Sequence, residues 1–402
     1  MDIAGEDIIC LALRAWDSPW KNNQQVMSRL ARMNRVLYVG PPRWMRESVA
    51  AWQLRVPPAP VLEAKENALF LYQEPRLLAR TRHSFAYNWL AGQMRLAQVR
   101  RLASSRLRFS RPILWVYDPM HAGAVGTFGE RIVVYSVIDN YREYYPVSQP
   151  RLREAIDRNH RRMLRAADVV FTVSESLRVE CHAHNPHCYY VPNGVPFERF
   201  QEALSSGAVP ADVAGIPRPI VGYVGVIQST IDLDLLQAIA LRRPDWSVLI
   251  VGPVEHAAYE GALEALRATP NVHILGGKET GQVPHYMKVC DVAVLPYRRN
   301  QATMHIDSIK LYEYLACGKP VVATDIPSAR RFPQFVSIAD GAEEFIRAIE
   351  EALVHSDRDE RERMAFASEQ NWDRRVREMG AILSQHMMRP RSTQPQDLSV
   401  EH

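Results

Sequence analysis

Short apolar runs alternate with amphipathic helical patterns along the chain. In the first half the apolar runs are Ile8–Leu13, Val36–Val39, Ala68–Tyr72, Ile113–Tyr117, Ile132–Val137, Val169–Val173 and Tyr189–Val191. The segments with helical spacing between them are Gln24–Arg32, Phe85–Ser104, Leu152–Arg165 and Glu175–His182. Continuously apolar strands that alternate with helices are typical of a parallel sheet covered on both faces.

The same alternation starts again after a polar segment rich in glycine and proline, residues 201–219. The apolar runs that follow are Ile220–Val224, Val248–Val251, Val272–Leu275, Val292–Leu295 and Pro320–Ala323. The helical segments are Leu233–Arg242, Tyr259–Ala268, Val283–Lys288, Ile309–Ala316 and Ala342–His355. We predict an α/β protein with two Rossmann-like, doubly wound domains, 1–200 and 201–386, and a disordered tail at 387–402. Because ligands bind beyond the carboxyl ends of parallel strands, the expected site is the cleft that the domains face.

The composition is that of an ordinary soluble globular protein. Of the 402 residues, 47% are hydrophobic and 23% are charged, which excludes a disordered chain, a collagen and a coiled coil. No apolar run approaches the roughly 18 residues of a membrane span, and the N-terminal segment lacks the basic and apolar regions of a signal peptide. Five cysteines, an odd number in a large chain, argue against a disulfide framework and for a reducing, cytoplasmic location.

Positive charge is concentrated in one stretch of the first half. Residues 1–198 contain 27 Lys and Arg against 18 Asp and Glu, whereas residues 199–402 contain 22 against 27. Pro75–Tyr117 has no acidic residue and nine arginines: Arg76, Arg80, Arg82, Arg95, Arg100, Arg101, Arg106, Arg108 and Arg111. With large apolar residues between them, the pattern favours contact with an anionic membrane at the inner face of the plasma membrane. A solvated helix face is the alternative, and nucleic acid is not expected without a recognisable binding module.

The densest group of candidate chemistry lies in the segment Ile309–Thr324. Its pattern predicts a helix that ends at Gly318 and a buried strand after it. Lys310 and Glu313 are three residues apart and share one face of the helix's first turns. The positive end of the helix and Lys310 suit a diphosphate, and a carboxylate one turn further on can accept both hydroxyls of a ribose. A surface Lys–Glu pair on a packing helix is the alternative.

This segment resembles the donor-binding motif of the group 1 glycosyltransferases with the GT-B fold, which reads Lys-Leu-Tyr-Glu-Tyr-Leu-Ala-x-Gly-Lys-Pro-Val-Val. Further matching pieces follow the same order and spacing: Asp168–Ser174, Val191–Val195, Gly222–Gly225, Asn271–Gly276 and Asp291–Tyr297. The resemblance implies a sugar-nucleotide donor held by the second domain and a saccharide acceptor, expected to be lipid-linked, held by the first. It implies transfer in cell-surface polysaccharide synthesis, with no metal ion or other cofactor.

The donor-binding residues implied by this resemblance follow strands or begin a helix. They are Gly225, Val226, Gly277, Lys278, Tyr297, Ser308, Ile309, Lys310 and Glu313. Backbone amides after the first strand and the first turn of the helix would hold the diphosphate, with help from Tyr297. Glu313 would bind the ribose, and the loop at Gly277 and Lys278 would border the base.

The sequence departs from the family pattern at two places. Many relatives have Glu-x7-Glu, whose second glutamate falls at Glu313, but the first position here is His305. Many retaining members also have an Arg and a Lys-Gly where this sequence reads Val226-Ile227-Gln228-Ser229. The Tyr297 loop and Asp307–Lys310 resemble instead a branch that includes inverting bacterial glucuronosyltransferases of exopolysaccharide synthesis. A sugar-nucleotide epimerase that hydrolyses, and a non-catalytic scaffold with a decayed site, are the alternatives.

Asp139 is the candidate general base for an inverting transfer. It follows the apolar run Ile132–Val137, so it is expected at a carboxyl strand end that faces the cleft. One carboxylate suffices to take the proton of the acceptor hydroxyl, and the inverting branch has its base on the equivalent loop. A helix N-cap is the alternative for Asp139, and His121, after Ile113–Tyr117, is the competing base.

Two further patterns resemble metal sites but are expected to be structural. Asp232-Leu233-Asp234 matches the metal-binding Asp-x-Asp of a different transferase fold, yet it opens a helix where acidic residues act as caps. The run Cys181–Cys188 contains two cysteines and three histidines, but all of them lie in one expected helix-to-strand loop rather than in paired knuckles.

Overall fold

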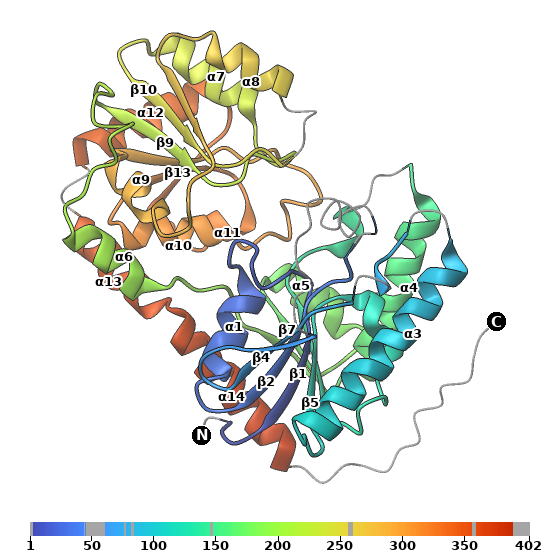
Figure 1. Ribbon diagram of the computed structural model, residues 1–402. Helices are drawn as coiled ribbons and strands as arrows, with labels where there is room; N and C mark the ends of the chain where they lie inside the picture. Colours follow the sequence, from blue (N-terminus) through green and yellow to red (C-terminus); the bar gives the residue numbers. More distant parts are fainter. Residues whose placement is uncertain are drawn as a thin grey trace.

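Continuously buried parallel strands form the two sheets of the protein. The computed structural model describes residues 3–43, 45, 61–75, 78–81, 84–144, 148–255, 260–355 and 359–388. One sheet has eight strands in the order β3-β4-β2-β1-β5-β6-β7-β8, and the other has six in the order β11-β10-β9-β12-β13-β14. All pairings are parallel except β3 with β4. Helices flank both sheets (Figure 1), so the predicted pair of doubly wound α/β domains is confirmed.

The first domain contains the eight-stranded sheet. Its strands are β1 Asp7–Leu11, β2 Arg35–Val39, β3 Leu62–Ala64, β4 Leu69–Tyr72, β5 Ile113–Val116, β6 Ile132–Val137, β7 Val169–Thr172 and β8 Cys188–Tyr190. Its helices are α1 Asn22–Leu30, α3 Phe85–Arg101, α4 Pro150–Ala166 and α5 Glu175–His182, with a π-helical turn at Leu102–Arg106 and 3₁₀ turns at Pro119–Ala124 and Tyr141–Tyr144. Every predicted apolar run of this half forms a strand.

The second domain contains the six-stranded sheet. Its strands are β9 Ile220–Val224, β10 Ser247–Val251, β11 Val272–Gly276, β12 Val292–Leu295, β13 Val321–Thr324 and β14 Val336–Ala339. Its helices are α6 Phe197–Ser205, α7 Leu233–Arg242, α8 Glu260–Arg267, α9 Val283–Val289, α10 Ile309–Ala316, α11 Pro327–Arg330, α12 Gly341–His355 and α13 Glu360–Glu369. The edge strand β14 is not predicted, because its two central residues are exposed and interrupt the apolar run.

The last helix, α14 (Trp372–Met388), returns to the first domain. Trp372, Met379 and Leu383 are buried in the core beneath β1 and β2, and Figure 1 shows the helix running along that domain. The predicted second domain, residues 201–386, includes this helix, so the structure differs from the predicted division. Met387 and Met388 belong to α14, and the rest of the predicted disordered tail lies outside the described residues.

The chain therefore passes between the domains twice, and the two crossings lie side by side. The Val195 N–H donates to the Gln370 carbonyl at 3.0 Å, and the Trp372 N–H donates to the Val195 carbonyl at 3.2 Å. A Cβ added to Gly194 would lie 2.9 Å from both the Gln370 oxygen and the Trp372 nitrogen. Glycine is thus required for the two crossings to pair.

The five cysteines are all buried free thiols. No helix in the described parts of the chain is both long and apolar enough to cross a bilayer.

Candidate functional site

The carboxyl ends of β9 and β10 meet at two glycines. A Cβ added to Gly252 would lie 1.9 Å from the carbonyl oxygen of Gly225, and one added to Gly225 would lie 1.8 Å from Cε of Lys310. Glycine at both positions is what allows the strand ends and the lysine stem to approach so closely. The Gly225 N–H donates to the Val251 carbonyl, so of the two expected backbone donors Val226 is the candidate for a diphosphate contact.

Lys310 occupies the first turn of α10, with its side chain lying over Gly225. Its Nζ is 5.7 Å from the centre of the Tyr223 ring and 6.0 Å from the centre of the Tyr297 ring. Burial by itself lowers the pKa of this ammonium, but the two tyrosines and the Glu313 carboxylate hold that pKa above its ordinary value. A charged ammonium beside the positive end of a helix is an arrangement suited to a diphosphate.

Tyr297 and Ser308 contact each other rather than an open surface. Their hydroxyl oxygens are 3.0 Å apart, and both residues are buried. Tyr297 therefore supports the start of α10 and the position of Lys310. The backbone N–H groups of the first turn, including that of Ile309, have no partner within the helix and could bind a diphosphate.

Glu313 lies one turn after Lys310 and is half-buried. Burial raises the pKa of its carboxyl group, and the cations of Lys310 and Arg199 act in the opposite direction. Arg199, on α6, was not among the predicted site residues, because no motif marks it and α6 was not predicted as a helix. A carboxylate with these neighbours, open to one side, can accept two ribose hydroxyls.

The sequence predicts Lys278 beside a nucleotide base, but its side chain forms an ion pair within the protein. Its ammonium lies 2.7 Å from the Asp212 carboxylate, which also accepts a hydrogen bond from the Tyr286 hydroxyl at 2.9 Å. The Lys278 side chain is therefore held by the segment before β9. The backbone at Gly277 lies beside Pro253 and is exposed.

Asp139 follows β6, as predicted, and is half-buried. Its Oδ1 accepts a hydrogen bond from the neighbouring Asn140 N–H at 2.9 Å. Its charge acts on Lys21 of the first domain, which also experiences the charge of Lys310 of the second. Asp139 of the first domain and Lys310 of the second therefore both lie near Lys21.

His121, the competing base, is buried in the 3₁₀ turn after β5. Burial lowers its pKa to about 4, with Arg95 and Arg80 acting in the same direction and Asp118 in the opposite one. Its Nδ1 has no hydrogen-bond partner in the described part of the chain. Because His121 is buried and Asp139 is partly exposed, Asp139 is the more accessible of the two candidate bases.

A buried polar network joins the start of α10 to the crossing between the domains. The Asp307 carboxylate accepts hydrogen bonds from the Asn193 N–H at 2.7 Å and from the Tyr312 hydroxyl at 2.9 Å, and Arg331 lies 3.1 Å away. Asn193 in turn accepts a hydrogen bond from the Asn22 amide, at 2.9 Å. Asn193 thus joins the first turn of α1 to the start of α10 through hydrogen bonds.

His305, at the position where many relatives have the first glutamate, faces the first domain. Its Nδ1 is 3.1 Å from the Ser176 hydroxyl, and its Nε2 is 3.5 Å from the Glu180 carboxylate. Both partners lie on α5, so this residue contributes to the contact between the domains.

The two patterns that resemble metal sites, Asp232–Asp234 and Cys181–Cys188, belong to ordinary helices, strands and their connections. Asp232 is the N-cap of α7 and accepts the Leu235 N–H at 3.1 Å, as the sequence predicts, and Asp234 lies 2.8 Å from Arg298. Within the described ranges, no three His, Cys, Asp or Glu side chains are arranged to hold a metal ion. Of the run Cys181–Cys188, expected in one loop, Cys181 and His182 end α5 and Cys188 begins β8, so only His184 and His187 lie in the loop between them.

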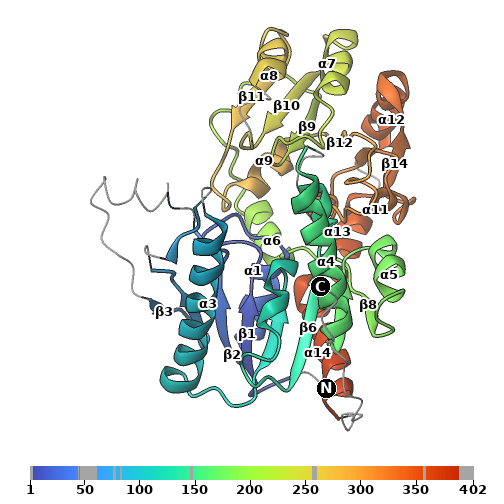
Figure 2. The same cartoon turned by 90° about the vertical axis from the view of Figure 1, so that its right-hand side faces the viewer.

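The arginine-rich stretch includes α3, which forms an outer side of the first domain (Figure 1, Figure 2). Arg95 does not belong to its outer face, so its expected membrane contact is wrong: it is buried and lies 3.6 Å from Glu74. Arg76 and Arg82 lie outside the described residues. The outward residues are Trp89, Leu90 and Met94, each more than half exposed, followed by Arg100 and Arg101.

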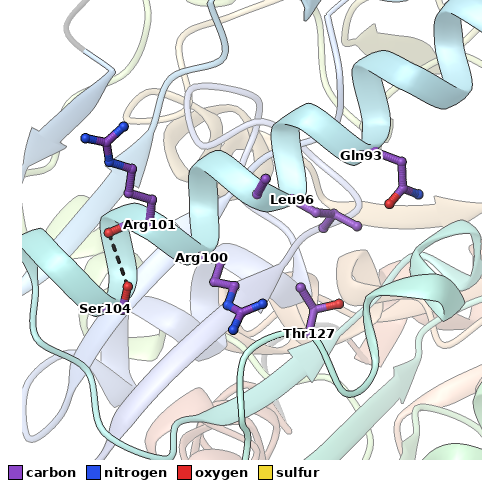
Figure 3. A pocket seen from close by; sticks show the side chains of 7 residues that line it. Gln93, Leu96, Arg100, Arg101, Ser104 and Thr127 are labelled. Atoms are coloured by element: carbon purple, nitrogen blue, oxygen red, sulfur yellow. Dashed lines mark hydrogen bonds between the residues drawn. The ribbon is translucent and has the colours of Figure 1, made fainter.

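A shallow cavity of about 380 Å³ lies at the basic end of α3. It is lined by Gln93, Leu96, Ala97, Arg100, Arg101, Ser104 and Thr127. Figure 3 shows Arg100 reaching toward Thr127, while Arg101 points to the other side of the helix.

Comparison with known proteins agrees with the chemistry of the second domain. Residues 218–355, which carry Gly225, Lys310 and Glu313, match the family "Glycosyl transferases group 1". A curated relative, the putative teichuronic acid biosynthesis glycosyltransferase TuaH of Bacillus subtilis, is 30% identical over 209 residues. The match covers 50% of this chain and 52% of TuaH, so the chain spans about half the length of this relative.

Solved structures match over both domains. Sucrose-phosphate synthase from Thermosynechococcus elongatus has a TM-score of 0.70 at 16% identity, over 94% of this chain and 98% of its own. Trehalose 6-phosphate synthase from Burkholderia multivorans has a TM-score of 0.67 at 13% identity, and the match covers 95% of this chain and 99% of that one. Anabaena HepE, solved with UDP, has a TM-score of 0.62 at 14% identity, and the match covers 95% of this chain and 100% of that one. The chain has the GT-B fold. Residues 218–355 are similar to the group 1 glycosyltransferases, and about half of the chain is similar to TuaH.

Proposed function

We propose that the protein transfers a sugar from a nucleoside-diphosphate sugar to a saccharide acceptor in cell-surface polysaccharide synthesis. The proposal rests on one observation. The side chain of Lys310, in the first turn of α10, lies over Gly225, and Glu313 follows one turn further on. These residues lie within the segment that matches the glycosyltransferase family. The name of TuaH supports a polysaccharide pathway, and the UDP bound to HepE, which shares the fold, supports a nucleoside-diphosphate donor.

In the proposed reaction each domain contributes one part of the chemistry. Asp139 accepts the proton of the acceptor hydroxyl as that oxygen attacks the anomeric carbon. The bond from that carbon to the diphosphate breaks, and the leaving diphosphate is stabilised by Lys310 and the N–H groups that begin α10. Attack and departure on opposite faces of the sugar would invert the anomeric centre.

The donor assignment is tested by a binding screen on the wild-type protein. We expect a nucleoside diphosphate, and the sugar nucleotide that contains it, to raise the melting temperature, because a ligand of the native state stabilises it. Thermal shift and titration calorimetry against UDP, GDP, ADP and dTDP and their sugar derivatives would measure this. A protein that bound none of them would contradict the proposed function.

We further propose that the acceptor is lipid-linked and that α3 holds the protein at the inner face of the plasma membrane. Trp89, Leu90 and Met94 form an exposed apolar surface at one end of the helix, and Arg100 and Arg101 follow at the other. An exposed tryptophan beside clustered arginines suits the interface of an anionic bilayer.

Two changes to α3 test the membrane contact. Replacing both Arg100 and Arg101 by Glu, or both Trp89 and Leu90 by Ser, should weaken binding to vesicles of phosphatidylglycerol and phosphatidylcholine by about ten- to a hundredfold. Vesicle co-sedimentation at low and high salt measures the effect, and salt should release the wild type.

The matched control for the charge reversal replaces Arg347 and Arg361 by Glu, since both are exposed on the second domain. Binding that ignored salt and both α3 variants would leave the solvated helix face as the correct interpretation.

A further inference from the structure

Helix α10 begins with two residues of the types that cap helices, and neither side chain caps it. Ser308 is the N-cap residue, and Asp307 precedes it. At a helix start, serine and aspartate side chains ordinarily accept a hydrogen bond from an N–H group of the first turn. The Ser308 side chain makes no such hydrogen bond, although its backbone is extended, as that of an N-cap residue is. The first turn of α10 therefore lacks a side-chain cap.

Caps of this kind form elsewhere in the same protein. Ser84, the N-cap residue of α3, accepts a hydrogen bond from the Tyr87 N–H at 3.2 Å. Ser174, the N-cap residue of α5, accepts one from the Leu177 N–H at 3.4 Å. Ser308 has the same position in its helix as these two serines, so the difference lies in the partner of its hydroxyl group.

The partner of the Ser308 hydroxyl is Tyr297, in the segment that follows β12. The two hydroxyl oxygens are 3.0 Å apart, and both residues are buried. The backbone of Tyr297 forms a β-bridge with Ile231, and its N–H donates to the Leu295 carbonyl at 2.9 Å. A fixed segment thus presents the tyrosine hydroxyl, which holds the Ser308 hydroxyl away from the helix.

The Asp307 carboxylate is also bound to groups other than the N–H groups of α10. It accepts hydrogen bonds from the Asn193 N–H and the Tyr312 hydroxyl, and Arg331 lies 3.1 Å away. A carboxylate that capped α10 would place a negative charge at the end of the helix that attracts anions. Because both side chains have other partners, neither one competes with an anion for the start of α10.

The N–H groups of the first turn remain as donors. The Leu311 N–H donates to the Ser308 carbonyl at 3.1 Å, whereas the N–H groups of Ile309 and Lys310 have no acceptor among the residues that the structure describes. The Lys310 side chain, which lies over Gly225, adds a positive charge at the same turn. An anion bound here would satisfy donors that the protein itself leaves without a partner.

We propose that Tyr297 is a positioning residue: it holds the Ser308 hydroxyl away from the first turn of α10 and so keeps the N–H groups of that turn available to the oxygens of the donor's diphosphate. This inference rests on the proposed function and gives Tyr297 a part in it that requires no contact with the donor. Without the tyrosine hydroxyl, Ser308 turns to cap α10 as Ser84 and Ser174 cap their helices. The diphosphate must then displace that cap before it can bind.

The first test is Tyr297→Phe, which keeps the ring and removes the hydroxyl. The dissociation constant of UDP, or of whichever of GDP, ADP and dTDP the wild type prefers, should rise about two- to thirtyfold. This range is the free energy of one N-cap hydrogen bond expressed as a ratio of dissociation constants. Titration calorimetry measures it. Tyr72→Phe is the control and should bind like the wild type, because it also removes a buried tyrosine hydroxyl, one bonded to Gln98 in the first domain.

The second test repeats Tyr297→Phe in a protein that already carries Ser308→Ala. Alanine has no hydroxyl and cannot cap the helix, so Tyr297→Phe should cause no further loss of affinity in this background. A tyrosine hydroxyl that contacted the diphosphate, or that acted through Lys310, would cause the same loss in both backgrounds. The melting temperature of Tyr297→Phe should not fall below that of the wild type, because the new cap replaces the lost hydrogen bond.

The outcomes separate this inference from the proposed function. A wild type that binds no nucleoside diphosphate overturns both. A wild type that binds one, with Tyr297→Phe equal to it in affinity, overturns only the role of Tyr297. An equal loss of affinity with and without Ser308 also overturns it, since Tyr297 would then act on the donor or on Lys310. A lower melting temperature together with that equal loss would identify a purely structural role.

Discussion

Replacing Asp139 by asparagine should lower the rate of sugar transfer by about 10²–10⁴-fold, the usual contribution of a positioned general base. The amide keeps the shape of the carboxylate and can no longer accept the proton of the acceptor hydroxyl. Donor affinity should stay close to that of the wild type, because Asp139 belongs to the first domain and the proposed donor residues Lys310 and Glu313 belong to the second. Single-turnover transfer and donor titration on the same preparation measure the two quantities.

A structural role for Asp139 gives a different result. Loss of a cap would cost about 1 kcal/mol of stability and leave the rate of the folded enzyme intact. Comparing the melting temperature with the transfer rate separates these cases. Asp245→Asn is the control for the substitution itself, since Asp245 is exposed and pairs with Arg243 on the second domain. Transfer by Asp139→Asn at the wild-type rate would make His121 the candidate.

Replacing Glu313 by alanine should weaken binding of the cognate nucleoside diphosphate by about 1.5–3 kcal/mol, the range for hydrogen bonds to a charged group. The carboxylate is proposed to accept both ribose hydroxyls, and alanine offers neither acceptor. Titration calorimetry gives the dissociation constant, and Glu351→Ala on the exposed side of α12 is the control. Equal affinity in Glu313→Ala would remove the ribose role and leave Glu313 as a partner of Lys310 and Arg199.

Local pattern was sufficient for the strands and for the donor helix. Ile132–Val137, Ile220–Val224 and Val292–Leu295 are strands with the predicted bounds, because a strand buried on both faces needs an unbroken apolar run. The helix Ile309–Ala316 also has its predicted bounds, and its end at Gly318 has the positive φ expected after a helix. Each of these features is determined by residues close together in sequence.

Features that depend on distant partners were not predicted. Arg95 has the same local pattern as Arg100, yet it turns inward because Glu74 and the Gly40 carbonyl offer it a buried partner. Lys278 is held by Asp212, a residue in the segment before the first strand of its domain. The spacing of residues along the chain indicates which side of a helix or loop a residue occupies. It does not indicate which residues of other segments lie against that side.

In the candidate site, too, contacts within one helix could be predicted and contacts between distant segments could not. Lys310 and Glu313 share a helix, so their proximity could be read from a three-residue spacing. By contrast, Asn193 joins α1 to the segment before α10 across the two domains, and no local pattern predicts that contact. The contact between the domains therefore required the structure.

The return of α14 to the first domain has a consequence for how the protein is made. Trp372 and Leu383 complete a core whose other residues, such as Ile8 and Tyr38, are synthesised near the start of the chain. The ribosome must therefore translate the entire second domain before the first can close its core. The second sheet, formed from one continuous stretch of chain, can fold during translation. During that interval the apolar surface that Trp372 later covers stays open to chaperones and to aggregation.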